Sequence, residues 1–391
     1  MANSAIALDP LVKRSLEENK PSPVLMKNYE LSTDSNLLEY IGELQKAEYV
    51  CKFIGSKTDF ILGKPHLLLS ASLPESALSR QRFSKKVFHQ HWSSKIHYES
   101  AKLDSFIRSI VSTNEKFYLK MSEYIIHENI NKDLDLFLQN DHVFIENIFT
   151  YINQILVDIA IRQCYGESAK NDSKFLSLIM LLLGQRFFFG EKYLNELLRF
   201  RLFSIRQESD IAREYLKGFV TKGTFKKLIE GSKDENHCFV NLILKNQKEL
   251  DIPDDIFYTS LPDYLYLFVT LIGVKLSNFL VDVSLNPLVC EKLEIEQKSI
   301  IAHYGKEITM RHLDKMVYLD AAITESLRLS NNKMPMKEAL CDIYLPNGVF
   351  VPRSSFCGYS NLARSRSSKL FLDDPHDFIP ERHLKLGTKL D

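Results

Sequence analysis

The stretch VYLDAAITESLRLS at residues 317–330 constrains this chain more than any other. Six residues recur along it with helical spacing and predict a helix: Leu319, Ala322, Ile323, Ser326, Leu327 and Ser330. Glu325 and Arg328 stand three residues apart, so their side chains meet on one face of that helix. A lone pair of this kind is ordinarily a surface ion pair worth roughly a few tenths of a kcal/mol. Here a second arginine, Arg382, follows in the segment FLDDPHDFIPERH at 371–383, and this ordered set distinguishes the pair from an ordinary one.

The composition is that of an ordinary soluble globular protein. Of the 391 residues, 45% are hydrophobic and 26% are charged, enough for a sizeable core. The 50 basic and 50 acidic residues give a formal net charge of zero, which indicates neither nucleic acid nor an anionic membrane as a partner. Six cysteines are scattered without a C-x-x-C pair, which favours free thiols in a reducing compartment over a disulfide framework.

No stretch of the sequence is typical of a signal peptide or a membrane span. The segment MANSAIALDPLVKRSLEENK becomes polar after a few residues. The most apolar stretch, 175–183, is far shorter than the roughly 20 residues that a spanning helix needs. A second apolar run, 264–274, is stopped by Lys275. These features predict a soluble, cytoplasmic protein with no membrane span.

Along the chain, the pattern predicts a mainly α protein with a small β element. Residues 1–65 are weakly patterned, and residues 66–391 are expected to form one domain. SRQRFSKKVFHQHWSSKI at 79–96 predicts an amphipathic helix, either with a solvated basic face or with that face turned to the acid groups of a bound ligand. Residues 144–165 predict a core helix ended by a glycine, and further helices run to Asn286–Pro287. Residues 343–351 predict a hairpin with an asparagine-glycine corner.

The usual catalytic motifs are missing. None of the eleven histidines forms H-E-x-x-H, no cysteine–histidine cluster has zinc spacing, and no Gly-rich phosphate loop or G-x-S-x-G elbow occurs. His89 and His91 lie two residues apart beside Trp92, without a further ligand nearby in the sequence. The residues alone therefore predict no metal site and no catalytic residue.

Three segments in order resemble parts of the cytochrome P450 superfamily. LDAAITESLRLS, DIYLPNGVFVP and FLDDPHDFIPERH are similar to its K helix, the following hairpin and its P-E-R region. FLVDVSLNPLVCEKLEIEQ resembles the end of its I helix with the start of its J helix, VDIAIRQCYGES resembles the end of its E helix, and residues 80–95 fall where its C helix would lie. The resemblance covers roughly 70–390 and is strongest to fungal members of small-molecule (secondary) metabolism. It implies a cytochrome P450-like helical fold, incomplete at both ends, with a haem cofactor and a small apolar substrate.

The resemblance also implies roles for individual residues. Glu325, Arg328 and Arg382 match the family's buried Glu-Arg-Arg triad, which is structural and not catalytic. Lys337 stands where the family often has an arginine for a haem propionate. A buried triad must be complete, because a missing partner leaves a buried charge uncompensated at a cost of about 3–5 kcal/mol.

The departures from the family pattern concern the haem centre. The family's ligand is a cysteine in F-x-x-G-x-x-x-C-x-G after the P-E-R segment, whereas HLKLGTKLD contains no cysteine. Cys357 precedes Arg382, and Arg353 replaces the glycine of that motif. In the central helix, 271–273 (Leu-Ile-Gly) aligns with the family's acid/threonine pair, with Thr270 one position away. Without these groups, neither a thiolate ligand nor a proton relay is expected.

Three hypotheses follow from this pattern. The first is a degenerate or truncated cytochrome P450 of a haem-thiolate monooxygenase lineage, not competent for oxygen activation, with haem absent or only weakly bound and a redox partner only if haem is bound. The second is a partial gene model of a working haem monooxygenase, which a downstream frame encoding F-x-x-G-x-x-x-C-x-G would favour. The third is a haem-free binding protein or cyclase on the same scaffold, which a ligand-induced thermal shift without iron would favour.

Overall fold

The structure is a computed structural model, and its contacts divide the chain into two compact units. One consists of residues 1–93 and 325–379, here called the sheet unit, and the other consists of 94–324 and 380–391, here called the helical unit. The sequence analysis instead placed a boundary at residue 65. That domain boundary stays a prediction. The structure describes residues 24–25, 42, 49–54, 57–63, 70, 72–87, 108–140, 144–171, 237–250, 269, 271–331, 335–345, 348–372 and 374–385.

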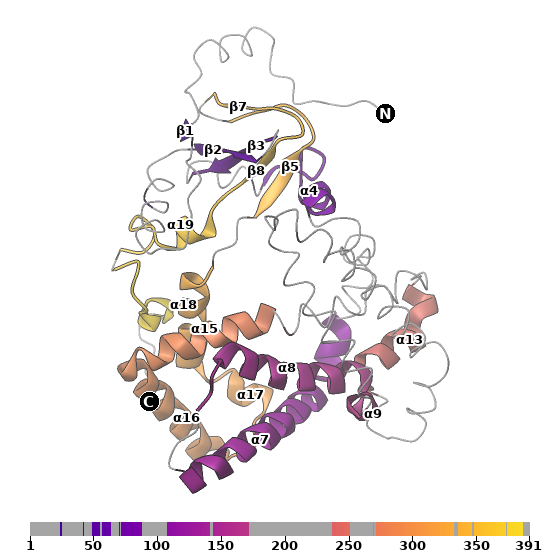
Figure 1. The fold of residues 1–391 in the computed structure, drawn as a ribbon, viewed down its shortest axis with the longest axis vertical. Coiled ribbons are helices and arrows are strands. Elements are labelled where there is room, and N and C mark those ends of the chain that lie inside the picture. Colours follow the sequence, from indigo (N-terminus) through magenta and orange to yellow (C-terminus); the bar gives the residue numbers. More distant parts are fainter. Residues whose placement is uncertain are drawn as a thin grey trace. The chain divides into compact units, whose positions relative to one another are not determined.

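The sheet unit is built on a six-stranded sheet with the strand order β1-β2-β3-β8-β5-β4. Figure 1 labels all of these strands except β4. The strands β2 and β3 form an antiparallel pair, and β3 continues in parallel to β8, with Asp59 opposite Phe356. The strand β8 is therefore interior, because β5 pairs with its other edge in antiparallel orientation. The bounds are β1 Val24–Leu25, β2 Tyr49–Ile54, β3 Lys57–Leu62, β4 Leu78–Ser79, β5 Met336–Ala339 and β8 Phe356–Gly358.

Three of the first four strands lie within residues 1–65, which the sequence pattern left without an expected element. Residues 49–62, YVCKFIGSKTDFIL, combine aromatic and β-branched residues around a Gly-Ser dipeptide, which is a hairpin signal. The signal is weak because lysine and aspartate interrupt it. The partner that stabilises this hairpin is β8, far away in the sequence, and local pattern does not reveal such a partner.

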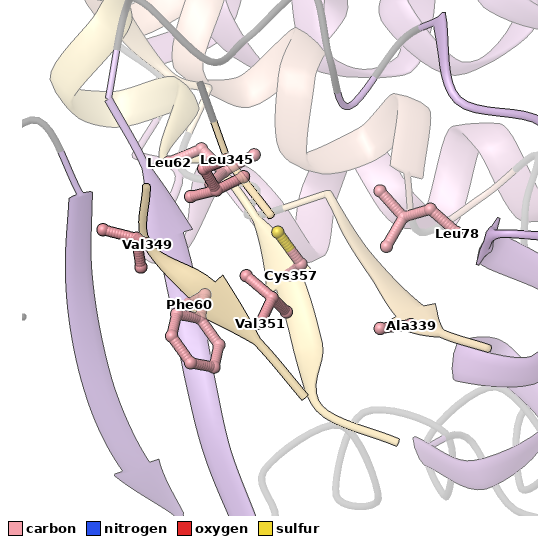
Figure 2. Packing of buried hydrophobic residues seen from close by; sticks show 8 residues of the cluster. All are labelled: Phe60, Leu62, Leu78, Ala339, Leu345, Val349, Val351 and Cys357. Atoms are coloured by element: carbon pink, nitrogen blue, oxygen red, sulfur yellow. The ribbon is translucent and has the colours of Figure 1, made fainter. Parts of the chain in front are cut away.

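The predicted late hairpin is confirmed and packs into the core of the sheet unit. Its strands are β6 Ile343–Tyr344 and β7 Phe350–Val351, paired in antiparallel orientation, while Pro346 and Asn347 lie outside the described residues. Gly348 has φ 84°, the left-handed region that favours glycine. Side chains from the hairpin and the sheet meet in one apolar cluster (Figure 2): Phe60, Leu62, Leu78, Ala339, Leu345, Val349, Val351 and Cys357.

The described helices of the helical unit include the predicted core helix and a helix that ends near Asn286–Pro287, as predicted. Helix α18 begins in the helical unit and ends in the sheet unit. In the sheet unit the helices are α4 Arg80–Val87 and α19 Asn361–Ser365. In the helical unit they are α7 Glu115–Asn140, α8 Ile148–Tyr165, α9 Glu167–Lys170, α13 Phe239–Leu250, α15 Ile272–Ser284, α16 Pro287–Tyr304, α17 Met310–Leu313 and the 3-10 turn Pro380–His383, with α18 spanning Val317–Leu329.

The ends of helix α8 are set by local chemistry. The side chain of Asn147 caps its first turn by accepting a hydrogen bond from the Thr150 amide at 2.9 Å. Gly166 ends it with φ 91°, and its own amide donates to the carbonyl of Arg162. The glycine stop predicted from sequence is thus confirmed.

Several sequence predictions fall on residues outside the described part of the chain. They include His89, His91 and Trp92 of the basic stretch, the apolar run 175–183, and Thr270. Of the predicted helix at 79–96, residues 80–87 are confirmed as α4. Within the described residues, no helix has the length and apolar character needed to cross a membrane.

Helix α15 packs against α8 and carries a buried hydroxyl. Ser277 is buried, and its Oγ has no hydrogen-bond partner among the described residues. Ser277→Ala is therefore expected to raise the free energy of unfolding by about 1 kcal/mol, because an unsatisfied buried hydroxyl is removed and alanine favours helix. Thermal unfolding of the two proteins measures the difference.

The control for this change is Ser284→Ala on the same helix. Ser284 is exposed, and its Oγ donates to the carbonyl of Val281, so little change is expected there. A lower melting temperature for Ser277→Ala would show that its hydroxyl holds a partner, such as a buried water.

Candidate functional site

The predicted pair Glu325 and Arg328 forms a buried, two-pronged ion pair on α18. Arg328 Nε donates to Glu325 Oε2 at 2.7 Å, and Arg328 Nη2 donates to Glu325 Oε1 at 2.8 Å. Glu325 is 0% exposed and Arg328 is 8% exposed, which rules out an ordinary surface pair. Charge-assisted bonds of this two-pronged kind are the strong ones, and they fix geometry as well as charge.

The remaining donors of Arg328 hold a segment that lies 37 to 49 residues further along the chain. Its Nη1 donates to the carbonyls of Ser365 (2.5 Å) and Pro375 (2.7 Å), and its Nη2 also donates to the carbonyl of Asp377 at 3.0 Å. All five N–H donors of the guanidinium are therefore used. The guanidinium carbon also lies 4.7 Å from the centroid of the Phe371 ring.

Glu325 holds the same segment through a second contact. Its Oε1 accepts a hydrogen bond from the backbone amide of Ile379 at 3.0 Å. The hydrogen bonds that tie the segment 365–379 to the pair thus all go to backbone groups of that segment. This explains why its partners could not be found by looking for complementary side chains in the sequence.

Arg382, the third predicted member, lies in the 3-10 turn Pro380–His383 of the helical unit and is partly buried. The structure thus brings Glu325 and Arg328 together. The place of Arg382 in a triad with them stays a prediction.

The neighbour of Arg382, Glu381, makes contacts that the sequence analysis missed. Glu381 Oε1 lies 2.5 Å from Lys292 Nζ and accepts a hydrogen bond from the Tyr318 hydroxyl at 2.9 Å. Burial alone would raise the pKa of Glu381, but the hydrogen bonds from Lys292 and Tyr318 outweigh it and lower the pKa. The contact therefore stabilises fully above the pKa of the unfolded carboxyl, and this contribution is lost as pH falls through the lower folded value.

A second carboxylate missed from the sequence begins α18. Glu296 on α16 is buried, and its carboxylate accepts hydrogen bonds from the amides of Tyr318 (2.6 Å) and Leu319 (2.9 Å). These amides belong to the first turn of α18 and have no partner within that helix. Because the cap comes from another helix, no local capping signal in the sequence indicates it.

Lys337, the predicted propionate cation, is part of β5 and is partly buried. Its Nζ donates to the carbonyl of Ser70 at 2.7 Å. Burial acts to raise the pKa of Glu75, but hydrogen bonds from Ser79 and two backbone amides, together with the charge of Lys337, lower it overall. The ammonium is thus engaged within the sheet unit.

Cys357 lies in the middle of the six-stranded sheet. It is 2% exposed, pairs with Phe60 of β3 on one side and with Lys337 of β5 on the other, and its sulfur lies among the cluster side chains (Figure 2). Like Cys357, the other cysteines whose state is described form no disulfide: Cys164, Cys238, Cys290 and Cys341. Burial, with a smaller effect from Cys238, raises the pKa of Cys164 to about 12. Among the described residues, no three His, Cys, Asp or Glu side chains are grouped to hold a metal ion.

Comparison with known proteins assigns one part of the chain to a family. The family profile of Cytochrome P450 matches residues 270–388, which include the Glu325–Arg328 pair, β5 to β8 and the 380–383 turn. Residues 270–388 belong to the cytochrome P450 superfamily. The superfamily predicted from the sequence is thus confirmed.

Relatives match in sequence, and a solved structure shares the fold. The chain is 32% identical over 115 residues to cytochrome P450 CYP94D109 of Paris polyphylla, covering 28% of this chain and 23% of that protein. It is 36% identical over 103 residues to cytochrome P450 94A1 of Vicia sativa, covering 26% and 19%. The crystal structure of the cytochrome P450DA heme domain matches with a TM-score of 0.70 at 11% identity, covering 93% of this chain and 82% of that one.

The structural match confirms the mainly α, cytochrome P450-like fold. The sequence matches span only about a fifth of the length of the curated relatives. Those two relatives come from plants, and a probable cytochrome P450 of Drosophila melanogaster matches at 28% identity over 126 residues, 32% of this chain and 21% of that protein. The expected likeness to fungal members stays a prediction.

A cytochrome P450 fold implies haem held by a cysteine thiolate, and the described residues do not fit that group. Cys357 is enclosed by sheet hydrogen bonds and apolar side chains. Lys337 binds a carbonyl of its own unit. In the central helix, Leu271 and Ile272 are apolar and partly exposed, and Gly273 is buried against Asn153 of α8.

Proposed function

We propose that this chain is a cytochrome P450-type protein of a haem-thiolate monooxygenase lineage whose 391 residues keep the structural frame but form no oxygen-activating centre. The observation that carries this is the position of Cys357, the last cysteine of the sequence. It lies in an interior strand, with its sulfur in an apolar cluster. A cysteine must be deprotonated and reach the iron to act as a ligand, and such an environment favours neither.

Moving Cys357 to a ligand position would require breaking the sheet. Strand β8 bonds to β3 along one edge and to β5 along the other. Releasing it would leave the backbone groups of three strands unpaired, and each buried unpaired group costs about 1–3 kcal/mol. The sheet therefore supports a structural role for Cys357.

The central helix supports the same proposal. A proton relay to bound oxygen needs a side chain that holds a proton, and 271–273 supplies two aliphatic side chains and a glycine. What the chain's own residues do is structural: Glu325 and Arg328 hold the segment 365–379, and Glu296 begins the helix that carries them.

The test is an absorption spectrum of the purified chain incubated with haem, reduced and exposed to carbon monoxide. We expect no thiolate-type red-shifted Soret band, and the same weak, nonspecific haem absorbance for the wild-type chain and for Cys357→Ala. A red-shifted band that Cys357→Ala abolishes would overturn the proposal. Cys290→Ala, which alters an exposed thiol on α16, is the matched control.

A second candidate function is a working haem monooxygenase encoded by a longer chain. The observation that favours it is that all five N–H groups of Arg328 are hydrogen-bonded. A buried charge is costly unless all its partners are kept, so a protein no longer selected for its structure would be expected to lose some of them. Sequencing the full transcript tests it. A downstream frame encoding F-x-x-G-x-x-x-C-x-G would support it, and its product would be expected to act on a small apolar molecule with a redox partner.

A further inference from the structure

Glu381 links three elements of the helical unit. It belongs to the 380–383 turn, its partner Lys292 lies on α16, and its other partner, the Tyr318 hydroxyl, comes from the start of α18. Tyr318 itself is 0% exposed, so its hydroxyl is held in place by the packing of the whole ring. The carboxylate of Glu381 therefore binds one donor that is fixed, the Tyr318 hydroxyl, and one on a flexible side chain, the Lys292 ammonium.

Helix α16 serves this junction twice. Glu296, one turn after Lys292 on the same helix, accepts the amides of Tyr318 and Leu319. Lys292 reaches the other end of Tyr318, and its Nζ lies 5.7 Å from the centroid of that ring. Helix α16 thus acts on Tyr318 in two ways. Glu296 accepts its backbone amide, and Lys292 binds the Glu381 carboxylate that accepts its hydroxyl.

We infer that Lys292, Glu381 and Tyr318 form a positioning site that sets where the 380–383 turn lies on helices α16 and α18. Two other ion pairs of the helical unit show the contrast. Lys298–Glu294 on α16 and Lys120–Glu307 are both about two-thirds exposed, and such pairs contribute little. Glu381 differs because a buried hydroxyl donates to the same oxygen that the lysine binds.

The inference goes beyond the proposed function and does not depend on haem. The turn determines the direction in which the chain continues after Glu381. The Leu384 amide continues the turn by donating to the Glu381 carbonyl at 3.1 Å. Loss of the carboxylate contact would release the turn from α16 while leaving the Glu325–Arg328 pair in the sheet unit unaltered.

The experiment is hydrogen exchange of the full chain, read on peptides covering 381–385 and, as an internal reference, on α8. Glu381→Gln and Lys292→Ala are each expected to speed exchange at 381–385 on the order of 5-fold, with α8 unchanged. The double variant is expected to exchange no faster than either single variant, because both remove the same contact. Tyr318→Phe, which removes only the hydroxyl, is expected to have a smaller effect in the same direction.

The charge-swapped variant Lys292→Glu with Glu381→Lys is expected to recover at least part of the protection. Lys298→Ala on the same helix is the matched control and leaves 381–385 unchanged. Unaltered exchange at 381–385 in Glu381→Gln would overturn the inference, as would additive effects of the two single changes. A thiolate band in the haem experiment would overturn the proposed function and leave this result as it is.

Discussion

Replacing Glu325 by alanine is expected to lower the free energy of unfolding by about 3–5 kcal/mol, the cost of leaving one member of a buried ion pair without its partner. Arg328 would keep its charge in a site where it is 8% exposed. Two of its five N–H groups would lose their acceptor, and the amide of Ile379 would lose its own. Of the hydrogen bonds that the pair makes to the segment 365–379, the three from the guanidinium to carbonyl groups would remain.

Urea unfolding followed by circular dichroism measures this effect. The matched control is Glu294→Ala on α16, whose carboxylate is exposed and pairs with Lys298 at i,i+4; the midpoint is expected to stay where it is. Glu325→Gln keeps the shape and one acceptor, so it should fall between the two. An Ala variant as stable as wild type would show that the buried pair is not needed to hold the segment.

Gly358→Ala is expected to destabilise the chain by about 3 kcal/mol, at the upper end of overpacking effects. An added Cβ at Gly358 would collide with the carbonyl oxygen of Pro335 and with Met336, whose Cα would be 3.0 Å away. The Met336 sulfur would also be too close, but the other two atoms belong to the backbone: Pro335 directly precedes strand β5, and Met336 begins that strand and pairs with Gly358 of β8. Backbone in a paired strand cannot move aside without losing ladder hydrogen bonds.

Gly273→Ala provides a sharp comparison for this prediction. There the added Cβ would meet the side-chain amide of Asn153, which can rotate, and alanine gains about 1 kcal/mol of helix propensity over glycine. We therefore expect Gly273→Ala to be nearly neutral, about 2 kcal/mol or more milder than Gly358→Ala by thermal unfolding. Equal effects of the two changes would contradict the contrast between a rigid and a movable neighbour.

The parts of the fold that follow from local pattern were predicted from the sequence. The predicted helix at 144–165 carries its own periodicity and glycine stop, and the structure has it at 148–165. The helix at 317–330 carries its periodicity and the hairpin at 343–351 its corner residues, and the structure confirms both. Glu325 and Arg328 could be paired because helical spacing alone places them on one face. Their burial could not be predicted in this way, because it depends on which other elements of the fold pack over α18.

What the sequence did not reveal depends on contacts between distant residues. Glu296 caps a helix that begins 21 residues later, and Arg328 binds carbonyl groups, which every residue has. The expected helical face of α18 shows the same limit. Ile323 and Leu327 are 38% and 41% exposed, while Tyr318 and Glu325 are fully buried, because the neighbouring elements determine which face is covered.

The parallel pairing of β3 with β8 has a consequence for how the chain is made. Asp59 pairs with Phe356, so about 300 residues must leave the ribosome between the two strands. At the usual synthesis rates of about 5–20 residues per second, β3 waits on the order of 15–60 s for its neighbour. During that interval the β2–β3 hairpin presents an open edge, the kind of surface on which nascent chains aggregate and which chaperones protect. The sheet unit is therefore among the last parts of the molecule that can close.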